Sequence, residues 1–243
     1  MGTAVAAVPV RPRRRCHGGC DAGYVCEPRD ALGSLRRVRR RLAEVGPSSE
    51  REPGDVDRVA LPEGDADVLR DLLVGERARV VIEVGLAYGS SALAIGEALL
   101  SQPEPRATHL IIDAYQEHFG DAGWRVVTEA GLSGVARLLR QRSQLVLPRL
   151  VTEGFVADAA FVDGSHVFHN VFVDLYFLGE LVRPSGLVIL DDCQWPSVAT
   201  AVRYFELNVG WRPVTIPAFT RLSAYRLPEP RVDSRFEDFQ PFG

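Results

Sequence analysis

Lysine is absent from this sequence of 243 residues, in which all 28 Lys and Arg positions are Arg. The P-loop nucleotidases, protein kinases, pyridoxal-phosphate enzymes and Schiff-base enzymes each need a lysine amine, so the sequence excludes these classes. A basic set made only of arginine is more typical of a GC-rich coding sequence than of phosphate binding.

Long apolar runs are also missing. No stretch approaches the ~20 apolar residues that a membrane-spanning helix needs, and the first residues run from apolar to basic, the reverse of a secretory signal. We therefore expect a soluble, cytoplasmic protein without a membrane partner.

The basic residues are concentrated near the N-terminus. Residues 1–41 hold ten Arg and three acidic residues, so the formal net charge of -4 leaves an acidic remainder. Blocks of like charge are more often solvated tails than nucleic-acid interfaces, and we expect no nucleic-acid partner. The sequence predicts a basic arm over residues 1–60, with a short helix over 34–45, followed by one domain over residues 61–243.

Cysteine is scarce, and three of the four thiols lie in that arm at Cys16, Cys20 and Cys26. With His17 they offer four soft ligands for zinc, although two adjacent ligands fit tetrahedral geometry poorly. The alternative is an arm whose thiols stay reduced. The fourth thiol, Cys193, is more typical of packing than of a nucleophile.

From Asp65 onward, helical and strand patterns alternate. Asp65 can cap a helix, and the stripe over residues 167–182 indicates another. Short apolar runs between the helical patterns predict buried strands at residues 79–84, 109–113, 159–163 and 187–192, with a weaker one at 136–140. Alternation of this kind indicates a doubly wound α/β fold with a mostly parallel sheet. Residues 211–216 and 221–227 are joined by a short loop and predict a closing antiparallel hairpin.

Each main strand ends in a carboxylate. In an open α/β sheet, ligands bind in the crevice beyond the carboxyl ends of the strands, so we expect these acids to converge on one site. They are Glu83, Asp113, Asp163, Asp191 and Asp192.

The loop after the first strand contains Gly85 and Gly89, which allow a ligand to approach the backbone closely. Counted from Gly85, the NAD fingerprint would need glycine where the chain has Ala87 and Ser90, so NAD is disfavoured. Asp113, which ends the next strand, is suited to hold two ribose hydroxyls.

These residues resemble the class I S-adenosylmethionine-dependent methyltransferases, in the catechol O-methyltransferase-like branch and its bacterial relatives, methyltransferase family 24. The glycine loop over residues 83–91 is similar to that branch's first motif. Further likeness lies in residues 113–116, Gly123, residues 129–132, and Arg142-Ser143-Gln144 with Pro148. The likeness covers about residues 60–227 and implies a seven-stranded sheet with a C-terminal antiparallel hairpin.

The resemblance also implies roles for individual residues. It places Asp163, Asp191 and Asp192 at a magnesium site and His166 where catechol-type enzymes have a lysine base. An imidazole can accept a proton at neutral pH, which an unperturbed lysine cannot. The cofactor-binding residues implied are Glu83, Gly85, Gly89, Ser91, Asp113, Ser143, Gln144 and Asp163.

We therefore expect an S-adenosylmethionine-dependent, Mg²⁺-assisted O-methyltransferase that acts on a small-molecule hydroxyl of a secondary metabolite or sugar. One alternative is a metal-independent N-methyltransferase of an aminosugar, because an acidic crevice attracts cations. Another is a catalytically silent cofactor-binding module. Whether the chain forms a homodimer is left open.

Overall fold

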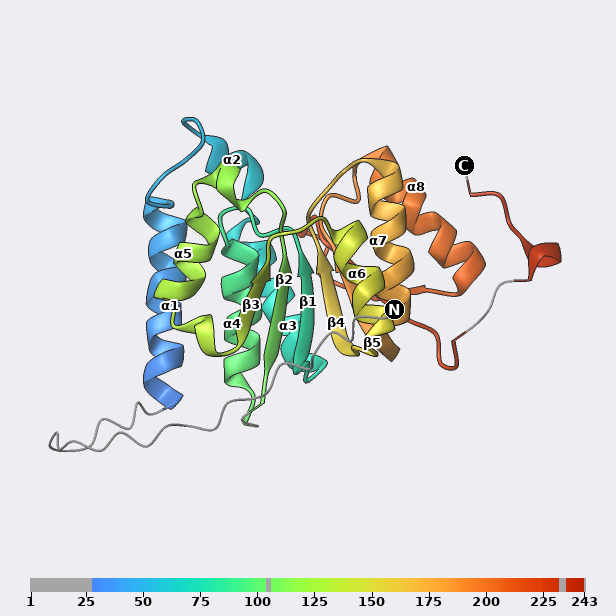
Figure 1. Cartoon of the computed structure of the whole chain (residues 1–243), viewed down its shortest axis with the longest axis horizontal. Helices are drawn as coiled ribbons and strands as arrows, with labels where there is room; N and C mark the ends of the chain where they lie inside the picture. The colour runs from blue at the N-terminus through green and yellow to red at the C-terminus, as the bar shows by residue number, and fades with distance from the viewer. Residues whose placement is uncertain (1–27, 104–105, 232–234, 243) are drawn as a thin grey trace, which may run out of the picture.

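A computed structural model describes residues 28–103, 106–231 and 235–242, with side chains from residue 31 onward. Its centre is a seven-stranded sheet in the order β3-β2-β1-β4-β5-β7-β6 (Figure 1). Strands β1 to β5 are parallel, and β7 runs antiparallel to β5 and β6. The strands are β1 (Val80–Val84), β2 (Thr108–Ile112), β3 (Ala136–Leu139), β4 (Ala157–Val162), β5 (Val182–Leu190), β6 (Arg212–Pro213) and β7 (Ser223–Arg226).

The predicted doubly wound sheet and its closing hairpin are confirmed. Almost all residues of β1, β2 and β4 are buried and most of them are apolar, which is the pattern of parallel strands covered on both faces. The weaker strand prediction corresponds to β3. The hairpin is shorter than predicted, because ladder pairing on its outer strand covers only Arg212 and Pro213.

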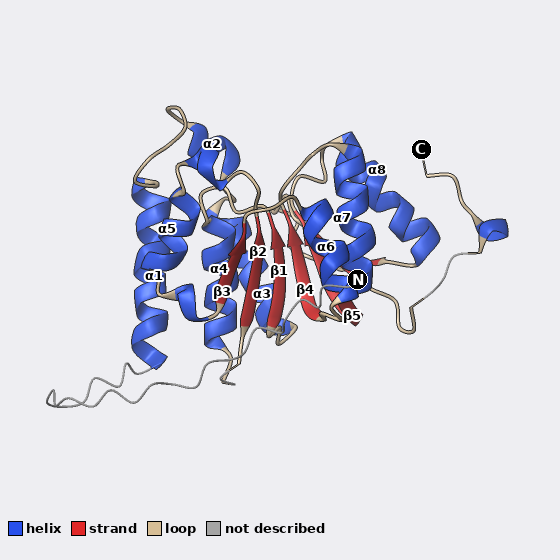
Figure 2. Ribbon diagram, viewed as in Figure 1, coloured by secondary structure: helices blue, strands red, loops and turns tan. Residues whose placement is uncertain are grey.

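Helices cover both faces of the sheet (Figure 2). Helices α6, α7 and α8 pack on one face, while α3 and α4 pack on the other, with α1 and α5 beyond α4. The helices are α1 (Pro28–Val45), α2 (Asp55–Val59), α3 (Glu63–Gly75), α4 (Ser90–Ser101), α5 (Ala122–Glu129), α6 (Ser143–Thr152), α7 (Phe168–Leu181) and α8 (Pro196–Tyr204). Short 3₁₀ turns span Gln116–Phe119, Leu132–Gly134 and Phe236–Asp238, and a π-helical turn, Phe205–Val209, follows α8.

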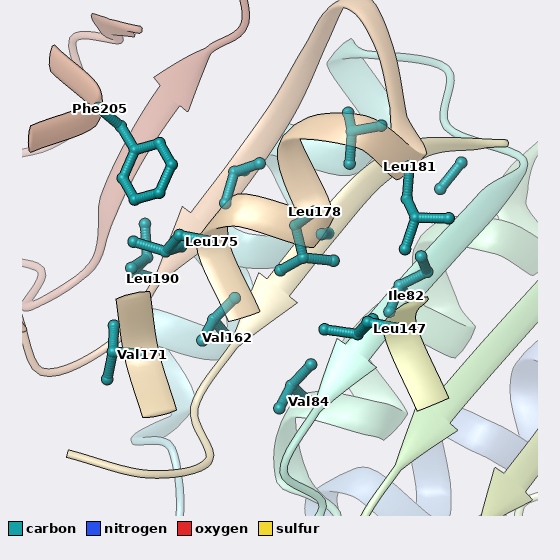
Figure 3. Packing of buried hydrophobic residues seen from close by; sticks show 14 of the residues in the cluster. Ile82, Val84, Leu147, Val162, Val171, Leu175, Leu178, Leu181, Leu190 and Phe205 are labelled. Atoms are coloured by element: carbon teal, nitrogen blue, oxygen red, sulfur yellow. The ribbon is translucent and has the colours of Figure 1, made fainter. Parts of the chain in front are cut away.

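Alternation along β1 decides which face each side chain meets. Ile82 and Val84 pack with Leu147 of α6 and Leu178 of α7 in the core cluster drawn in Figure 3. Neighbouring residues of a strand point to opposite faces, so Glu83 is directed to the side of the sheet that carries α4.

Helix α1 is longer than the predicted helix over residues 34–45 and belongs to the core. Leu35, Val38 and Leu42 are buried in one cluster with residues of α4 and α5. Arg39 is also buried, with its guanidinium 2.8 Å from Glu97 and 2.7 Å from Asp67. This helix therefore packs on the sheet domain instead of standing apart from it. The domain boundary at residue 60 stays a prediction.

Cys16, His17, Cys20 and Cys26 lie outside the described residues, so the zinc alternative stays untested. Among the helices that the structure describes, none is long and apolar enough to cross a membrane.

Candidate active site

A cavity of about 410 Å³ opens beyond the carboxyl ends of β1, β2 and β4. This is the place that the parallel topology predicts for a ligand site. The predicted site residues that line it are Gly85, Asp113, Ser143, Gln144, Asp163, His166 and Asp192. Four others lie outside its lining: Glu83, Gly89, Ser91 and Asp191.

The loop from Gly85 to Gly89 forms the floor of the cavity at the end of β1. Gly85 has a φ of +95°, and a Cβ atom there would lie 2.1 Å from the carbonyl oxygen of Asp163. Gly89 has a φ of +87° and would bring a Cβ atom 3.0 Å from the Gly123 carbonyl oxygen. Glycine is therefore required at both positions by the backbone conformation and by close packing.

Glu83 supports this loop from below. Its side chain is fully buried, and its Oε1 atom accepts a hydrogen bond from the Ser91 hydroxyl at 2.5 Å. The Oε2 atom lies 2.8 Å from Nε2 of His109, although the two atoms are not aligned for a hydrogen bond. Glu83 and Ser91 thus join the end of β1 to the start of α4, and their predicted contact with a cofactor stays a prediction.

Asp113 lines the cavity and also holds the glycine loop in place. Its Oδ2 atom accepts hydrogen bonds from the backbone N–H groups of Leu86 at 3.1 Å and Ala87 at 3.3 Å, and from Nε2 of Gln116 at 3.0 Å. Its Oδ1 atom accepts one from the N–H of Tyr115 at 2.7 Å. A carboxylate with this many donors is fixed in orientation before any ligand binds.

Ser143 and Gln144 line the cavity at the beginning of α6. The Gln144 amide nitrogen donates to the Ser143 hydroxyl at 2.9 Å and to Oδ1 of Asp174 at 3.1 Å. Asp174 lies on α7, and its burial raises the pKa of its carboxyl to about 7, against the lowering effect of the hydrogen bonds from Ser143 and Gln144. Asp174 was not among the predicted site residues, and its one sign in the sequence is an acid within the apolar stripe of α7.

Asp163, His166 and Asp192 form an acidic cluster with one imidazole. One ligand atom from each lies within 4.8 Å of the others, and Nε2 of His166 is 2.9 Å from Oδ2 of Asp192. Burial of the Asp163 carboxyl, together with the nearby charges of Asp191 and Asp192, raises its pKa well above the usual range. The structure therefore brings together two of the three predicted metal ligands with the predicted base.

Asp191, the third predicted ligand, has a different partner. Arg221 forms a two-pronged ion pair with it, with Nε 2.8 Å from Oδ1 and Nη2 2.6 Å from Oδ2. The Asp191 carboxyl is fully buried, and this burial raises its pKa despite the guanidinium. Arg221 precedes β7 and was not predicted, because no local pattern marks which arginine of the hairpin reaches back to the end of β5.

Helix α2 contributes Arg58 and Val59 to the cavity and is tied to the glycine loop. The hydroxyl of Tyr88, a fully buried loop residue, donates a hydrogen bond to Asp55 at the start of α2. The Arg51 guanidinium makes two hydrogen bonds of 2.7 Å with the same carboxylate and holds the pKa of Asp55 well below its usual range. The wall of the cavity and its floor are thereby joined by one buried contact.

Aromatic rings lie at two places around the site. Tyr115 is about half exposed and stacks on His118, with ring centroids 5.6 Å apart. Trp195 stacks on His166 at 6.4 Å between centroids. These rings offer flat apolar surface beside the polar cluster.

Comparison with known protein families finds a match for part of the chain. Residues 82–193 match the model of a family described as a methyltransferase domain, methyltransferase family 24. A search of curated protein sequences found no match.

Solved structures share the fold. The O-methyltransferase TomG of Streptomyces achromogenes, solved with S-adenosylmethionine, is 19% identical with a TM-score of 0.59, over 82% of this chain and 90% of that one. An O-methyltransferase of Bacillus cereus, in complex with SAH, is 17% identical with a TM-score of 0.55, over 81% and 90%. CalS11, a TDP-rhamnose 3'-O-methyltransferase of calicheamicin biosynthesis, is 14% identical with a TM-score of 0.55, over 82% and 95%.

The family match covers the part of the chain that forms the floor of the cavity and its acidic cluster, from Ile82 in β1 to Cys193 after β5. The strands in the matched segment belong to the parallel part of the sheet, and the antiparallel hairpin lies at the edge of the sheet. Residues 82–193 thus carry a methyltransferase domain, and the sheet has the fold of the class I S-adenosylmethionine-dependent methyltransferases.

Proposed function

We propose that the chain transfers the sulfonium methyl group of S-adenosylmethionine to a hydroxyl of a small-molecule acceptor. The observation that carries this proposal is the gathering of Asp163, His166 and Asp192 in the same cavity as Asp113 and the start of α6. The solved structures of similar fold that bear O-methyltransferase names support the choice of oxygen over nitrogen.

In this proposal the cofactor lies along the floor of the cavity. Asp113 would accept hydrogen bonds from the two ribose hydroxyls, and Ser143 and Gln144 would contact adenine. Gly85 would let the cofactor lie close to the protein backbone, since this residue has no side chain to obstruct it.

The acidic cluster fits a divalent cation. Three carboxylates, those of Asp163, Asp191 and Asp192, lie near one another, and the Arg221 guanidinium balances one of them. Two negative charges then remain, which match one divalent cation. Asp163 and Asp192 would hold it, and carboxylate oxygens suit Mg²⁺ or Mn²⁺. Such a cation supplies positive charge that lowers the pKa of a hydroxyl beside it.

His166 is the proton acceptor in this proposal. With Nε2 donating to Asp192, Nδ1 is the nitrogen that can take the hydroxyl proton. As the proton moves to His166, the acceptor oxygen forms a bond to the methyl carbon, and the carbon–sulfur bond breaks to leave neutral S-adenosylhomocysteine. Holding oxygen, carbon and sulfur in line would contribute roughly 7 to 11 kcal/mol.

One observation favours a second function. The His166–Asp192 pair can accept a proton without a metal, and the acidic cluster would attract a cationic amine. A metal-independent N-methyltransferase of aminosugars therefore remains the second candidate.

Transfer of a labelled methyl group from S-adenosylmethionine tests the two functions on a panel of phenols, glycosides and aminoglycosides. For the first, we expect transfer to a hydroxylated acceptor, loss of transfer in EDTA and recovery with Mg²⁺. His166→Ala should lower the rate ~10²-fold or more without weakening cofactor binding. Transfer to an aminoglycoside that survives EDTA would favour the second function, and cofactor binding without any transfer would favour a silent binding module.

A direct measurement of cation binding tests the proposed role of Asp163 and Asp192 independently of activity. Titration of the protein with Mn²⁺ should show one site that is lost in Asp192→Asn, whereas Asp71→Asn, an exposed acid on α3, should leave it unchanged. Equal Mn²⁺ affinity in the Asp192 variant would contradict the assignment of this cluster as the cation site.

A further inference from the structure

Asp174 is a buried carboxyl that the proposed methyl transfer does not use. Its exposed fraction is 1%, and within the described residues no ion pair reaches it. Its partners are two side chains at the start of α6, Ser143 and Gln144, both of which line the cavity. An acid kept at such a place without a cation needs an explanation, because burying a carboxylate costs free energy.

The hydrogen bonds around Asp174 determine which way the Gln144 amide faces. Both hydrogens of Nε2 have acceptors, one in the Ser143 hydroxyl at 2.9 Å and one in Oδ1 of Asp174 at 3.1 Å. The Ser143 hydroxyl also acts on Asp174, lowering the pKa of its carboxyl. The amide oxygen, Oε1, is the atom left over, and in the part of the chain that the structure describes no donor reaches it.

The backbone adds donors beside this oxygen. The first N–H groups of a helix have no acceptor within the helix. The N–H groups of Leu145 and Val146 bond to the carbonyl of Arg142, while those of Ser143 and Gln144 find no acceptor among the described residues. The start of α6, which lines the cavity, thus holds one side-chain acceptor and two backbone donors without partners among the described residues.

This pattern matches a purine that carries an amino group at C6. Adenine has a donor at N6 and an acceptor at N1, whereas the 6-oxo base hypoxanthine has an acceptor at O6 and a donor at N1. Above the pKa of about 7, where Asp174 is ionised, a reversed Gln144 amide would place its oxygen against the carboxylate, and two acceptors would oppose each other without a hydrogen between them.

We propose that Asp174 is the positioning residue that fixes the Gln144 amide with its oxygen toward the cavity and thereby makes the cofactor site selective for adenine over 6-oxo purine. The inference rests on the proposed function, in which the cofactor's adenine contacts Ser143 and Gln144. Asp174 acts only through these neighbours and does not touch the cofactor itself.

The test compares S-adenosylhomocysteine with its 6-oxo analogue, S-inosylhomocysteine, by calorimetry at about pH 8.5. We expect the wild type to prefer the adenine compound at least ~100-fold, since a site built to accept a hydrogen bond rejects an analogue that cannot donate it. In Asp174→Asn the new amide can accept from Gln144 or donate to it, so both orientations are satisfied. The preference should then fall below ~10-fold, chiefly because the 6-oxo analogue binds better.

The control is Glu180→Gln, which removes an exposed charge from the same helix and should keep the wild-type preference. A purely structural role for Asp174 would weaken both ligands equally and leave their ratio unchanged, which would overturn the inference. If Asp174→Asn does not fold, Gln144→Met removes the amide oxygen that would accept from adenine. An unchanged ratio of the affinities for the two compounds in that variant would also overturn the inference. Failure of the wild type to bind either compound would instead refute the proposed cofactor site.

Discussion

Replacing Asp113 by Asn should weaken both the glycine loop and the binding of S-adenosylhomocysteine. The substitution keeps the shape of the side chain but removes its charge and replaces one acceptor oxygen with a donor. Asp113 receives hydrogen bonds from four groups, three on Oδ2 and one on Oδ1. The asparagine oxygen can accept the three hydrogen bonds that Oδ2 receives in the wild type. The N–H of Tyr115 then faces the asparagine NH₂ group, which cannot accept a hydrogen bond.

The magnitude follows from these four bonds. A hydrogen bond to a charged group contributes about 1 kcal/mol more than a neutral one, and an unsatisfied buried donor costs about 1 to 3 kcal/mol. Three weakened bonds and one lost bond amount to about 4 to 6 kcal/mol, shared between folding and ligand binding. If the ribose hydroxyls donate to Asp113 as proposed, we expect the affinity for S-adenosylhomocysteine to fall about 10- to 100-fold, with the rest appearing as a lower melting temperature.

Calorimetric titration with S-adenosylhomocysteine and thermal unfolding measure the two parts. Glu117→Gln is the matched control, because it makes the same charge change at an exposed carboxyl four residues away. We expect this variant to resemble the wild type in both assays. Wild-type affinity and melting temperature in Asp113→Asn would refute the reasoning that this carboxylate anchors the loop and the cofactor.

Three further predictions follow from packing and burial. The stability of Asp174→Asn relative to the wild type should rise by about 3 kcal/mol from pH 5 to pH 8. The reason is that burial raises the pKa of the wild-type carboxyl from 3.8 to about 7, so the wild type loses free energy of unfolding as the pH rises through this range. A difference in urea unfolding that stays constant with pH would contradict this prediction. Gly85→Ala should abolish S-adenosylhomocysteine binding, because the new methyl group would lie 2.1 Å from the Asp163 carbonyl oxygen. The control is Gly131→Ala, at a residue with a similar positive φ and no atom within 4 Å of the new methyl group. This variant should lose about 1 to 2 kcal/mol of stability and retain binding. Leu35→Ala in α1 should lower the free energy of unfolding by about 2 to 5 kcal/mol, while Val45→Ala, which is 77% exposed, should change it by less than about 0.5 kcal/mol; equal effects would show that α1 is not part of the core.

Local patterns predicted most of the sheet. The short apolar runs that became β1, β2 and β4 are buried on both faces, and this makes them continuous and easy to recognise in sequence. Helix α1 was harder to interpret, because the basic residues around Leu35, Val38 and Leu42 suggest a solvated arm. The structure shows that the apolar stripe, with its partners on α4, decides the position of this helix.

The site was predicted where it depends on strand ends and was missed where it depends on distant pairs. Asp113 and Asp163 follow strands directly and Asp192 comes two residues after β5, so topology alone brings them to one cavity. The role of Arg221 depends on a partner 30 residues away, and that of Asp174 depends on the packing of α7 against α6. Such contacts are set by tertiary structure and leave no periodic signal in the chain.

The buried contact between Tyr88 and Asp55 has a thermodynamic consequence for how two ligands would share this cavity. Tyr88 belongs to the loop under the proposed cofactor, and Asp55 begins the helix that supplies Arg58 and Val59 to the wall. A ligand that restrains one of these segments also restrains the other through this contact. Coupling free energy is reciprocal, so an acceptor held against α2 would raise the affinity for the cofactor by the same factor as the cofactor raises the affinity for the acceptor.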